Sequence, residues 1–300
     1  MSDDVLRVGL VGAGPWARSV HAPGLIAHPG TELTAVWARR PEAAAELGAP
    51  VVADFDALLA GVDAVAFAVP PAVQAELAVR AAAAGKHVLL EKPVAATLAD
   101  AERVADAVER AGVASIVVFI RRFAPETVAW LDGVAAHPGW AGGSARWLSG
   151  ALLGGAYSGS AWRHEGGALA DIGPHVLDLL DAALGPITDV LSAHKSEPDL
   201  WHLVLGHDGG ATSTATLSMR LPMRPTVTEV SVYGDSGYRD LTGRATPAAD
   251  SYAVLLDEFT AMVHSGQTEH RVDVRRGVHV QRVLNQVLRA AVPVAAAGRR

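Results

Sequence analysis

The stretch that decides the fold reads Val8-Gly9-Leu10-Val11-Gly12-Ala13-Gly14-Pro15-Trp16-Ala17. Directly after a short apolar run, Gly12, Gly14 and Ala17 occupy the three small positions of the spacing G-x-G-x-x-G/A. The first glycine permits a tight strand-to-helix turn, the second lets backbone approach a pyrophosphate, and a small third residue allows close helix–strand packing. The following helix would direct its free N–H groups toward the phosphates. We therefore predict a dinucleotide-binding turn.

The segments around this turn supply the context that the motif requires, since glycine spacing alone is weak in a chain with 30 glycines. Short apolar runs alternate with segments of helical periodicity through the first 120 residues. The expected strands are Val5–Val11, Leu33–Trp37, Ala64–Val69, His87–Leu90 and Ser115–Ile120, and the expected helices are Pro41–Leu47, Val73–Ala84 and Leu98–Ala111. This alternation predicts a doubly wound parallel sheet. His21 and Pro23 predict that the first helix is short or kinked.

The pattern changes after about residue 121. Glycine and serine crowd 139–160, and one long helical pattern covers Ala168–Leu184. The β-like segments that follow are Asp189–His194, Leu200–Leu205, Ala211–Ser218 and Thr226–Tyr233, with Gly209-Gly210 as a hairpin turn. Helices near Tyr252–His264 and Arg275–Ala291 close the chain. We predict a nucleotide-binding domain over 1–121 and an α+β domain with a largely antiparallel open sheet over 122–300.

The end of the second expected strand bears on the choice of dinucleotide. A site that prefers NAD usually has a carboxylate about 20 residues beyond the glycines, bound to the ribose hydroxyls. Here Val36-Trp37-Ala38-Arg39-Arg40-Pro41 offers two guanidiniums instead. Arginine binds phosphate through paired hydrogen bonds. We therefore favour NADP over NAD, while solvated charges opening a helix remain the plainer interpretation of Arg39 and Arg40.

Two further blocks carry residues suited to proton transfer. Glu91-Lys92-Pro93 follows a buried strand, at the carboxyl edge where ligands bind in open α/β sheets. Lys92 there either reaches a substrate hydroxyl or forms an ordinary salt bridge with Glu91. Asp171 and His175 stand at i and i+4, so they share a helix face, or flank a first turn if Gly173-Pro174 opens the helix. Histidine transfers protons near neutrality, and a neighbouring carboxylate can hold its tautomer.

These blocks together resemble the glucose–fructose oxidoreductase / inositol dehydrogenase / MocA (Gfo/Idh/MocA) family. The similarity is carried by the Gly12–Ala17 turn, Val69-Pro70-Pro71, Gly85-Lys86-His87-Val88 with Glu91-Lys92-Pro93, Arg122-Phe123, and Gly166-Gly167 leading to Asp171 and His175. The resemblance implies a Rossmann domain, a second domain whose open sheet serves substrate binding and a homodimer or homotetramer, and hydride transfer to or from a sugar, inositol or related polyol. It also implies that Lys92, Asp171 and His175 form the catalytic group.

From the motifs and the resemblance we expect two sets of binding residues. The set expected to contact NADP or NAD is Gly12, Gly14, Pro15, Trp16, Ala17, Arg39, Arg40, Val69, Pro70, Glu91 and Lys92. The set expected to contact substrate is Lys92, Arg122, Tyr157, Trp162, Arg163, Asp171 and His175, although a buried Trp162 beside a surface Arg163 is the plainer alternative. Two departures concern substrate identity: Gln74 stands where members often carry His, and a Gly/Ser-rich loop spans 154–160.

Composition excludes several other classes of protein. Lys and Arg number 25 against 32 Asp and Glu, and no dense basic run offers the footprint that nucleic acid needs. The chain has no cysteine, which excludes disulfides and thiolate chemistry. The acidic start Met1-Ser2-Asp3-Asp4 does not resemble a secretory signal, and no apolar run approaches the ~18 residues of a membrane helix. We expect a cytoplasmic protein.

Three alternatives remain open at this stage. A non-catalytic nucleotide- or sugar-sensing protein would share the fold, but its sequence would be expected to lose the lysine or the Asp/His pair. A glycoside hydrolase that uses NAD as a transient redox partner would consume no external nicotinamide. A metal enzyme is the third, but Asp171 and His175 have no third ligand in a convincing context, so we expect no metal site.

Overall fold

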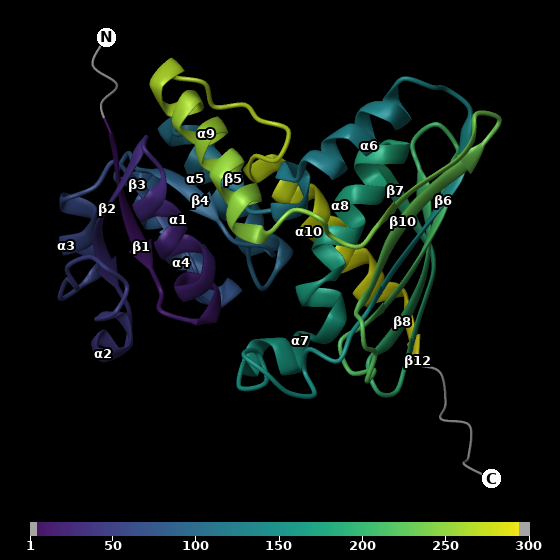
Figure 1. Ribbon diagram of the computed structural model, residues 1–300, viewed down its shortest axis with the longest axis horizontal. Coiled ribbons are helices and arrows are strands. Elements are labelled where there is room, and N and C mark those ends of the chain that lie inside the picture. The colour runs from purple at the N-terminus through teal and green to yellow at the C-terminus, as the bar shows by residue number, and fades with distance from the viewer. Residues whose placement is uncertain (1–4, 294–300) are drawn as a thin grey trace. The chain divides into compact units, whose positions relative to one another are not determined.

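The computed structural model describes residues 5–293, so the acidic start Met1–Asp4 lies outside the described residues. The chain forms two compact units (Figure 1). One unit contains the residues up to Phe123 together with Pro247–Gln281, and the other contains Ala124–Thr246 together with the residues from Arg282 onward. The sequence placed 122–300 in one domain. The structure instead returns 247–281 to the first unit, where α9 (Ala248–Ser265) packs against the helices that follow the first strand.

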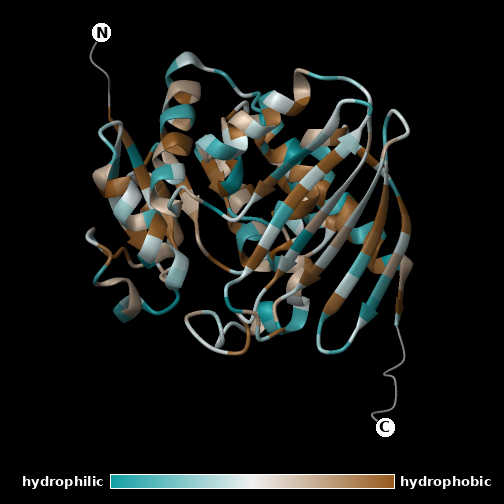
Figure 2. Ribbon diagram, turned by 45° about the vertical axis from the view of Figure 1, so that its right-hand side comes forward, coloured by the Kyte–Doolittle hydropathy of each residue, from teal (hydrophilic) through white to brown (hydrophobic). Residues whose placement is uncertain are grey.

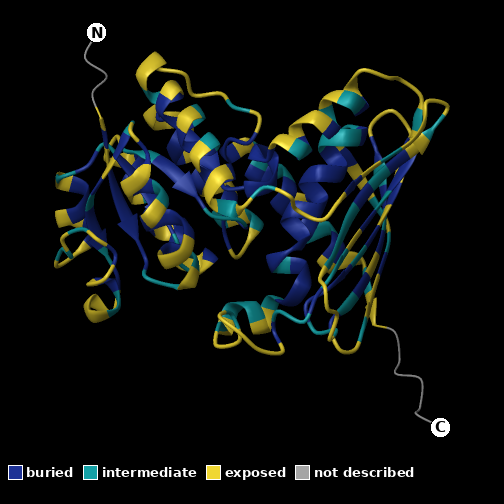
Figure 3. Ribbon diagram, viewed as in Figure 1, coloured by how far each residue is buried: buried dark blue, intermediate teal, exposed yellow. Residues whose placement is uncertain are grey.

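The first unit is built on a five-stranded parallel sheet in the order β2-β1-β3-β4-β5. Its strands are β1 (Leu6–Val11), β2 (Thr31–Trp37), β3 (Ala64–Phe67), β4 (His87–Leu90) and β5 (Ser115–Val117). Nearly every residue of β1, β3, β4 and β5 is buried (Figure 3), as expected for strands covered by helices on both faces. The doubly wound parallel sheet predicted from the alternating apolar runs is confirmed.

Helices connect these strands in the predicted alternation. They are η1 (Ala17–His21, a π-helix), α1 (Ala22–Ala27), α2 (Pro41–Ala44), α3 (Phe55–Ala60), α4 (Pro71–Ala83) and α5 (Leu98–Ala111). The first helix is irregular, as His21 and Pro23 predicted. In α5 the Thr97 side chain accepts from Asp100 N as the N-cap, and Gly112 ends the helix in the left-handed conformation. The short helix α3 was not predicted from the sequence.

The register of the first sheet aligns the carboxyl ends of four strands. Val11 lies opposite Trp37 of β2 and Phe67 of β3, and Ala66 lies opposite Leu89 of β4. The residues that follow these strands therefore leave the sheet at one edge. The glycine turn, the Trp37–Arg40 segment, the Val69-Pro70 turn and the loop with Lys92 all begin there, which is the position where open α/β sheets bind ligands.

The second unit is built on a seven-stranded sheet in the order β11-β10-β6-β9-β8-β7-β12 among the described residues. The strands are β6 (Trp140–Leu148), β7 (Ile187–Ser196), β8 (Leu200–His207), β9 (Thr212–Ser218), β10 (Val227–Gly234), β11 (Gly237–Thr242) and β12 (Ala291–Pro293). All pairs are antiparallel except β6 with β9 and β12 with β7. Figure 2 shows hydrophobic and hydrophilic residues alternating along these strands, the pattern of a sheet with one covered face.

The helices of this unit are α6 (Pro125–Ala135), α7 (Ala161–Asp171), α8 (Gly173–Leu184) and the end of α10 (Val274–Ala290). Helix α8 is buried along almost its whole length and packs against β6, β7, β9 and β10. The fold class predicted from sequence, an α+β second domain with a largely antiparallel sheet, is confirmed. The Gly209-Gly210 hairpin is also present, between β8 and β9.

Three details differ from the sequence prediction. The pattern over Ala168–Leu184 is two helices, since α7 ends at Asp171 and α8 begins at Gly173. The glycine-rich region after residue 139 contains β6, where a Cβ on Gly142 would lie 2.7 Å from the carbonyl oxygen of Thr212. Strand β9 lies so close to β6 at Gly142 that only glycine fits there, although a run of glycines in a sequence usually indicates a loop. Helix α6 and strand β11 were also missed.

No helix within residues 5–293 is both long enough and apolar enough to cross a membrane.

Candidate functional site

The glycine turn closes tightly onto the neighbouring strand. Gly12 has φ +110°, and a Cβ there would lie 2.4 Å from the carbonyl oxygen of Ala68, which follows β3. The Gly12 N–H donates to Trp37 O at 2.9 Å, so the turn is also fixed to β2. A Cβ on Gly14 would meet no atom within 4 Å. Gly12 is therefore required by the fold itself, whereas the small size of Gly14 leaves open space at the turn.

A cavity of about 280 Å³ opens at this edge of the first sheet. Three turns contribute its walls: the glycine turn, the end of β2 with Arg39 and Arg40, and the turn after β3 with Val69 and Pro70. The lining residues are Gly12, Ala13, Gly14, Trp37, Ala38, Arg39, Arg40, Ala43, Ala68, Val69, Pro70 and Val73. Six of the predicted cofactor residues thus share one cavity. Pro15, Trp16, Ala17, Glu91 and Lys92 are not part of its lining.

Arg18 ties two walls of this cavity together, a role that the sequence analysis missed. Its Nε donates to Ala13 O at 3.2 Å and its Nη2 donates to Ala43 O at 2.5 Å. Its Nη1 also pairs with Glu46 at 3.2 Å. Ala13 and Ala43 both line the cavity. Arg18 therefore fixes the spacing between the glycine turn and the short helix that begins after Arg40.

The loop with Lys92 leaves the same edge after β4. Glu91 Oε1 lies 2.9 Å from Nε2 of the buried His21, whose Nδ1 lies 2.8 Å from the Tyr252 hydroxyl. Burial, and secondarily the charge of Glu91, raise the pKa of Tyr252 well above its ordinary value, so the phenol stays neutral. The salt bridge between Lys92 and Glu91, the plainer alternative from the sequence, stays a prediction. In the structure, the carboxylate of Glu91 pairs with His21.

In the second unit, Asp171 and His175 flank the break between α7 and α8, as predicted for a helix opened by Gly173-Pro174. Both are buried, with exposed fractions of 6% and 7%. Arg163 donates from Nε to Asp171 Oδ2 at 2.9 Å, and the His175 ring stacks on Trp147 with centroids 5.7 Å apart. The structure therefore gives Arg163 an internal carboxylate partner.

The other predicted substrate residues divide between the units. In the second unit the Arg163 guanidinium lies 4.5 Å from the Tyr157 ring centroid and 4.3 Å from that of Trp162, so these three form one cluster. Both aromatic side chains are half-buried, and the plain alternative of a buried Trp162 beside a surface Arg163 is not what is observed. Arg122 belongs to the first unit, in the buried short helix η2 (Ile120–Phe123).

A buried carboxylate shapes the helix that ends in Asp171. Gly167 interrupts α7 with φ 60°, which frees the Ala168 N–H to donate to Asp199 Oδ2 at 2.7 Å. Trp201 Nε1 donates to the other oxygen at 3.1 Å. Burial raises the pKa of Asp199 above its ordinary value, although both hydrogen bonds act in the opposite direction. Asp199 thus caps the second part of α7 from outside the helix, a role that no sequence signal indicated.

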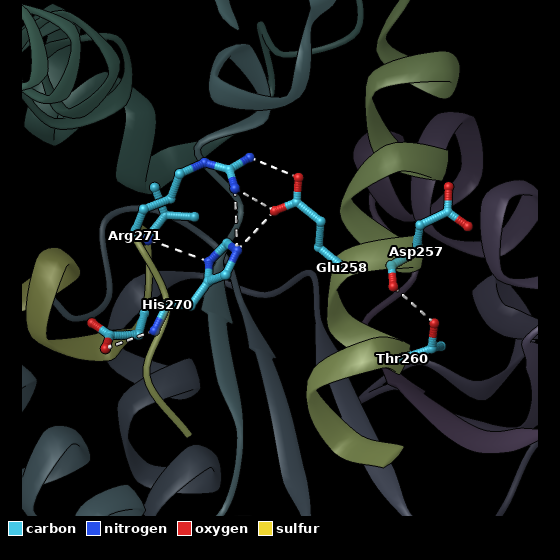
Figure 4. A network of polar contacts seen from close by, with 7 residues as sticks. Asp257, Glu258, Thr260, His270 and Arg271 are labelled. Atoms are coloured by element: carbon cyan, nitrogen blue, oxygen red, sulfur yellow. Dashed lines mark hydrogen bonds and ion pairs between the residues drawn. The ribbon is translucent and has the colours of Figure 1, made fainter. Parts of the chain in front are cut away.

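A separate network in the first unit fastens the segment between α9 and α10 (Figure 4). Glu258 accepts from His270 Nε2 at 2.7 Å and from Arg271 at 2.6 and 2.8 Å. Burial opposes ionisation of Glu258, but these bonds outweigh it and lower its pKa. His270 also stacks on Phe123, with centroids 6.2 Å apart. The bonds to Glu258 brace the segment 247–281 internally, and the stacking of His270 on Phe123 joins it to the end of η2.

Two family models match this architecture. The model described as "Oxidoreductase family, NAD-binding Rossmann fold" matches residues 6–119, and the GFO/IDH/MocA C-terminal domain matches residues 142–239. The chain belongs to the Gfo/Idh/MocA family. The resemblance inferred from the sequence motifs is therefore confirmed.

Three known proteins illustrate the similarity. A dTDP-3,4-didehydro-2,6-dideoxy-alpha-D-glucose 3-reductase of Streptomyces violaceoruber is 38% identical over 60% of this chain. The matched region covers 55% of the length of that relative. D-xylose 1-dehydrogenase (NADP(+)) 2 of Haloferax volcanii is 29% identical over 85% of this chain and 86% of its own length. The crystal structure of GenD2 from gentamicin A biosynthesis, in complex with NAD, superposes with a TM-score of 0.84 at 24% identity, covering 99% and 95% of the two chains.

Substitution by alanine should reduce stability at Gly12 and dinucleotide binding at Gly14. Gly12→Ala places a Cβ 2.4 Å from backbone and forces alanine to adopt φ +110°, so its free energy of unfolding should fall by about 2 kcal/mol or more. Gly14→Ala meets no protein atom and should retain stability while binding NAD(P)H at least about tenfold more weakly, because the new methyl blocks backbone approach to phosphate. Urea unfolding and fluorescence titration measure both effects. Equal destabilisation by the two substitutions would contradict this assignment.

Asp199 predicts a pH-dependent difference in stability. A carboxyl group with a raised pKa binds its proton more tightly in the folded state, so its contribution is complete below the unfolded pKa of about 4 and is lost as pH rises through the folded pKa. The free energy of unfolding of the parent protein minus that of Asp199→Asn should therefore decrease as pH rises from about 4, then level off. Denaturant unfolding across this range measures the difference. A difference that does not vary with pH would contradict the buried environment of Asp199.

Proposed function

We propose that this protein is an NAD(P)-dependent oxidoreductase that acts on a hydroxyl or carbonyl carbon of a sugar-like substrate. The observation that carries the proposal is the cavity at the carboxyl edge of the first sheet, where Gly14 leaves backbone exposed to a ligand. The lining of this cavity is mainly apolar and includes the residues Arg39 and Arg40, which suits a nucleotide with attached phosphates. Membership of the Gfo/Idh/MocA family supports the same function.

Within this proposal we favour NADP as the dinucleotide. Arg39 and Arg40 line the cavity after β2, and neither Asp nor Glu is among its lining residues. A ribose 2′-phosphate placed there gains charge-assisted hydrogen bonds, whereas a ribose hydroxyl lacks the carboxylate that an NAD site usually supplies. The D-xylose dehydrogenase relative carries NADP in its name, but the GenD2 structure holds NAD, so the relatives support either dinucleotide.

For catalysis, we propose that Lys92, Asp171 and His175 act on one substrate oxygen. A dinucleotide held at the cavity by Gly14, Arg39 and Arg40 would supply the hydride acceptor for oxidation and the hydride donor for reduction. His175 takes the hydroxyl proton as the C–H and O–H bonds are replaced by a carbonyl, and it supplies that proton in the reverse direction. Lys92 donates a hydrogen bond that stabilises the developing alkoxide. Asp171, whose carboxylate is held by Arg163, orients the pair.

We propose sugars and related polyols, free or linked to a nucleotide, as the substrate class. Support comes from the names of relatives, one a reductase of a dTDP-linked sugar and another a D-xylose dehydrogenase. The cluster of Arg163, Tyr157 and Trp162 adds aromatic faces of the kind that pack against sugar rings. We also propose a homodimer or homotetramer formed by the second sheet, because the resemblance to the family implies that the open sheet of this domain serves oligomerisation.

Removal of the two guanidiniums tests the choice of dinucleotide. In the double variant Arg39→Ala/Arg40→Ala, the affinity for NADPH should fall by at least about tenfold while that for NADH changes little, since only the former loses charge-assisted bonds. Quenching of tryptophan fluorescence reports binding, because Trp37 lines the cavity. Arg103→Ala, which removes an exposed arginine of α5 outside the cavity, is the control. A parent protein that binds NADH more tightly, or an unchanged preference in the variant, would overturn the choice of NADP.

Substitution of the proton-transfer residues tests the catalytic role. Lys92→Ala and His175→Ala should each lower kcat by about 10²–10⁴-fold with NADPH affinity retained, because both groups act on the substrate oxygen. Lys86→Ala serves as the matched control, since Lys86 precedes β4 and donates to Val62 O at 2.8 Å at the opposite end of the strand. Turnover is measured by NAD(P)H absorbance with a panel of sugars and nucleotide-linked sugars. A parent protein that binds dinucleotide but turns over none of them would favour the non-catalytic sensor instead.

A further inference from the structure

The backbone on both sides of Lys92 is held by one buried side chain, Gln74 of α4. Gln74 is 0% exposed. Its Oε1 accepts from Glu91 N at 2.9 Å, and its Nε2 donates to Glu91 O at 2.7 Å and to Val94 O at 2.9 Å. The carboxamide therefore forms two hydrogen bonds with the backbone of Glu91, which precedes Lys92, and one with the backbone of Val94, two residues after it. Three hydrogen bonds from one rigid group leave the loop little freedom to shift.

The chemistry of this contact requires an amide. The loop presents one N–H donor and two carbonyl acceptors within 3.0 Å of Gln74, with Pro93 O more distant at 3.5 Å, and a carboxamide offers one acceptor oxygen and two N–H groups in return. A neutral imidazole offers one donor and one acceptor. A carboxylate offers acceptors alone and would face two carbonyl oxygens. The three bonds are thus particular to glutamine at this position.

A second clamp holds the same loop through the side chain of Glu91. A carboxylate accepts only, so His21 Nε2 donates to Glu91 Oε1 at 2.9 Å, and His21 Nδ1 lies 2.8 Å from the Tyr252 hydroxyl. Tyr252 is fully buried, and a Cβ on Gly24 would lie 2.5 Å from its ring, so the ring position is fixed by close packing against α1. The chain Tyr252–His21–Glu91 therefore orients the residue that precedes Lys92.

Gln74 and His21, which hold this loop, lie on segments that begin close to the cavity. Helix α4 starts at Pro71, directly after the lining residues Val69 and Pro70, and Gln74 is one turn further. His21 ends the π-helix η1, which follows the glycine turn. Helix α4, which contributes Val73 to the cavity lining, therefore also fixes the loop with Lys92.

From this arrangement we propose that Gln74, assisted by the Tyr252–His21–Glu91 chain, is a positioning residue that holds Lys92 at the geometry needed for catalysis. The inference rests on the proposed function, because it assigns to these residues a task in the same reaction. Gln74 is absent from the cavity lining, so its effect is on the placement of Lys92 and not on dinucleotide contact. A misplacement of about 1 Å at a catalytic group can cost on the order of 100-fold in rate.

The test compares Gln74→Ala, Lys92→Ala and the double variant in the full-length protein. Gln74→Ala should lower kcat by roughly 10- to 100-fold without changing NADPH affinity, and it should have no further effect once Lys92 is alanine. Hydrogen exchange of the Glu91 amide should accelerate in Gln74→Ala, independently of activity, because that N–H loses its acceptor. Glu76→Ala, an exposed residue of the same helix, is the control and should leave each of these quantities unchanged.

The outcomes separate this inference from the proposed function. A parent protein that turns over no substrate would defeat the proposed function. Full turnover by Lys92→Ala would defeat the catalytic role of Lys92, whereas a defective Lys92→Ala combined with a fully active Gln74→Ala would defeat only the positioning role. If the loss in the double variant equals the product of the two single losses, Gln74 acts independently of Lys92, which also overturns the inference. If Gln74→Ala does not fold, Tyr252→Phe replaces it: the ring is kept, the hydroxyl bond to His21 is removed, and a smaller loss of kcat at constant NADPH affinity is expected.

Discussion

The parallel register of β1, β3 and β4 is the constraint on which the candidate site depends. Since parallel strands end together at one edge, Gly12, Val69 and Lys92 are brought to the same edge although they are far apart in the sequence. The pairing is close enough that a Cβ on Gly12 would strike the carbonyl of Ala68. Such a turn admits only glycine at its first position, and the fold and the cavity therefore require the same residue.

Hydrogen-bonded side chains convert this edge into a defined geometry. Arg18 bridges the glycine turn and α2, which both contribute to the cavity wall, and Gln74 and His21 fix the loop with Lys92. In the second unit, Asp199 supplies the acceptor for the N–H that the break at Gly167 frees, so the segment ending in Asp171 is held by a carboxylate from outside the helix. Gln74 and Asp199 each pair backbone groups that the fold buries with a side chain, as burial requires. These residues prepare positions for the groups that we propose to react.

The sequence predicted the parallel sheet and the glycine turn that follows its first strand, because both depend on local patterns. Short apolar runs alternating with amphipathic segments are visible without a structure, and the order of Gly12, Gly14 and Ala17 is meaningful only after a strand. The supporting residues were not predicted, since a buried Gln74 or Asp199 has no periodicity or spacing that distinguishes it from a surface residue. Gln74 was noted only as a departure from the family. Strand β6 was missed because Gly142, which the neighbouring strand requires, favours a loop locally.

The proposed reaction uses Lys92 from the first unit and Asp171 and His175 from the second. The most direct measurement is a crystal structure of the protein with NADP⁺ and a substrate analogue. We predict that the dinucleotide lies in the cavity beside Arg39 and Arg40, with Lys92 Nζ and the His175 ring both within about 3.5 Å of one analogue oxygen. A dinucleotide bound elsewhere, or an analogue oxygen contacted by neither Lys92 nor His175, would contradict it.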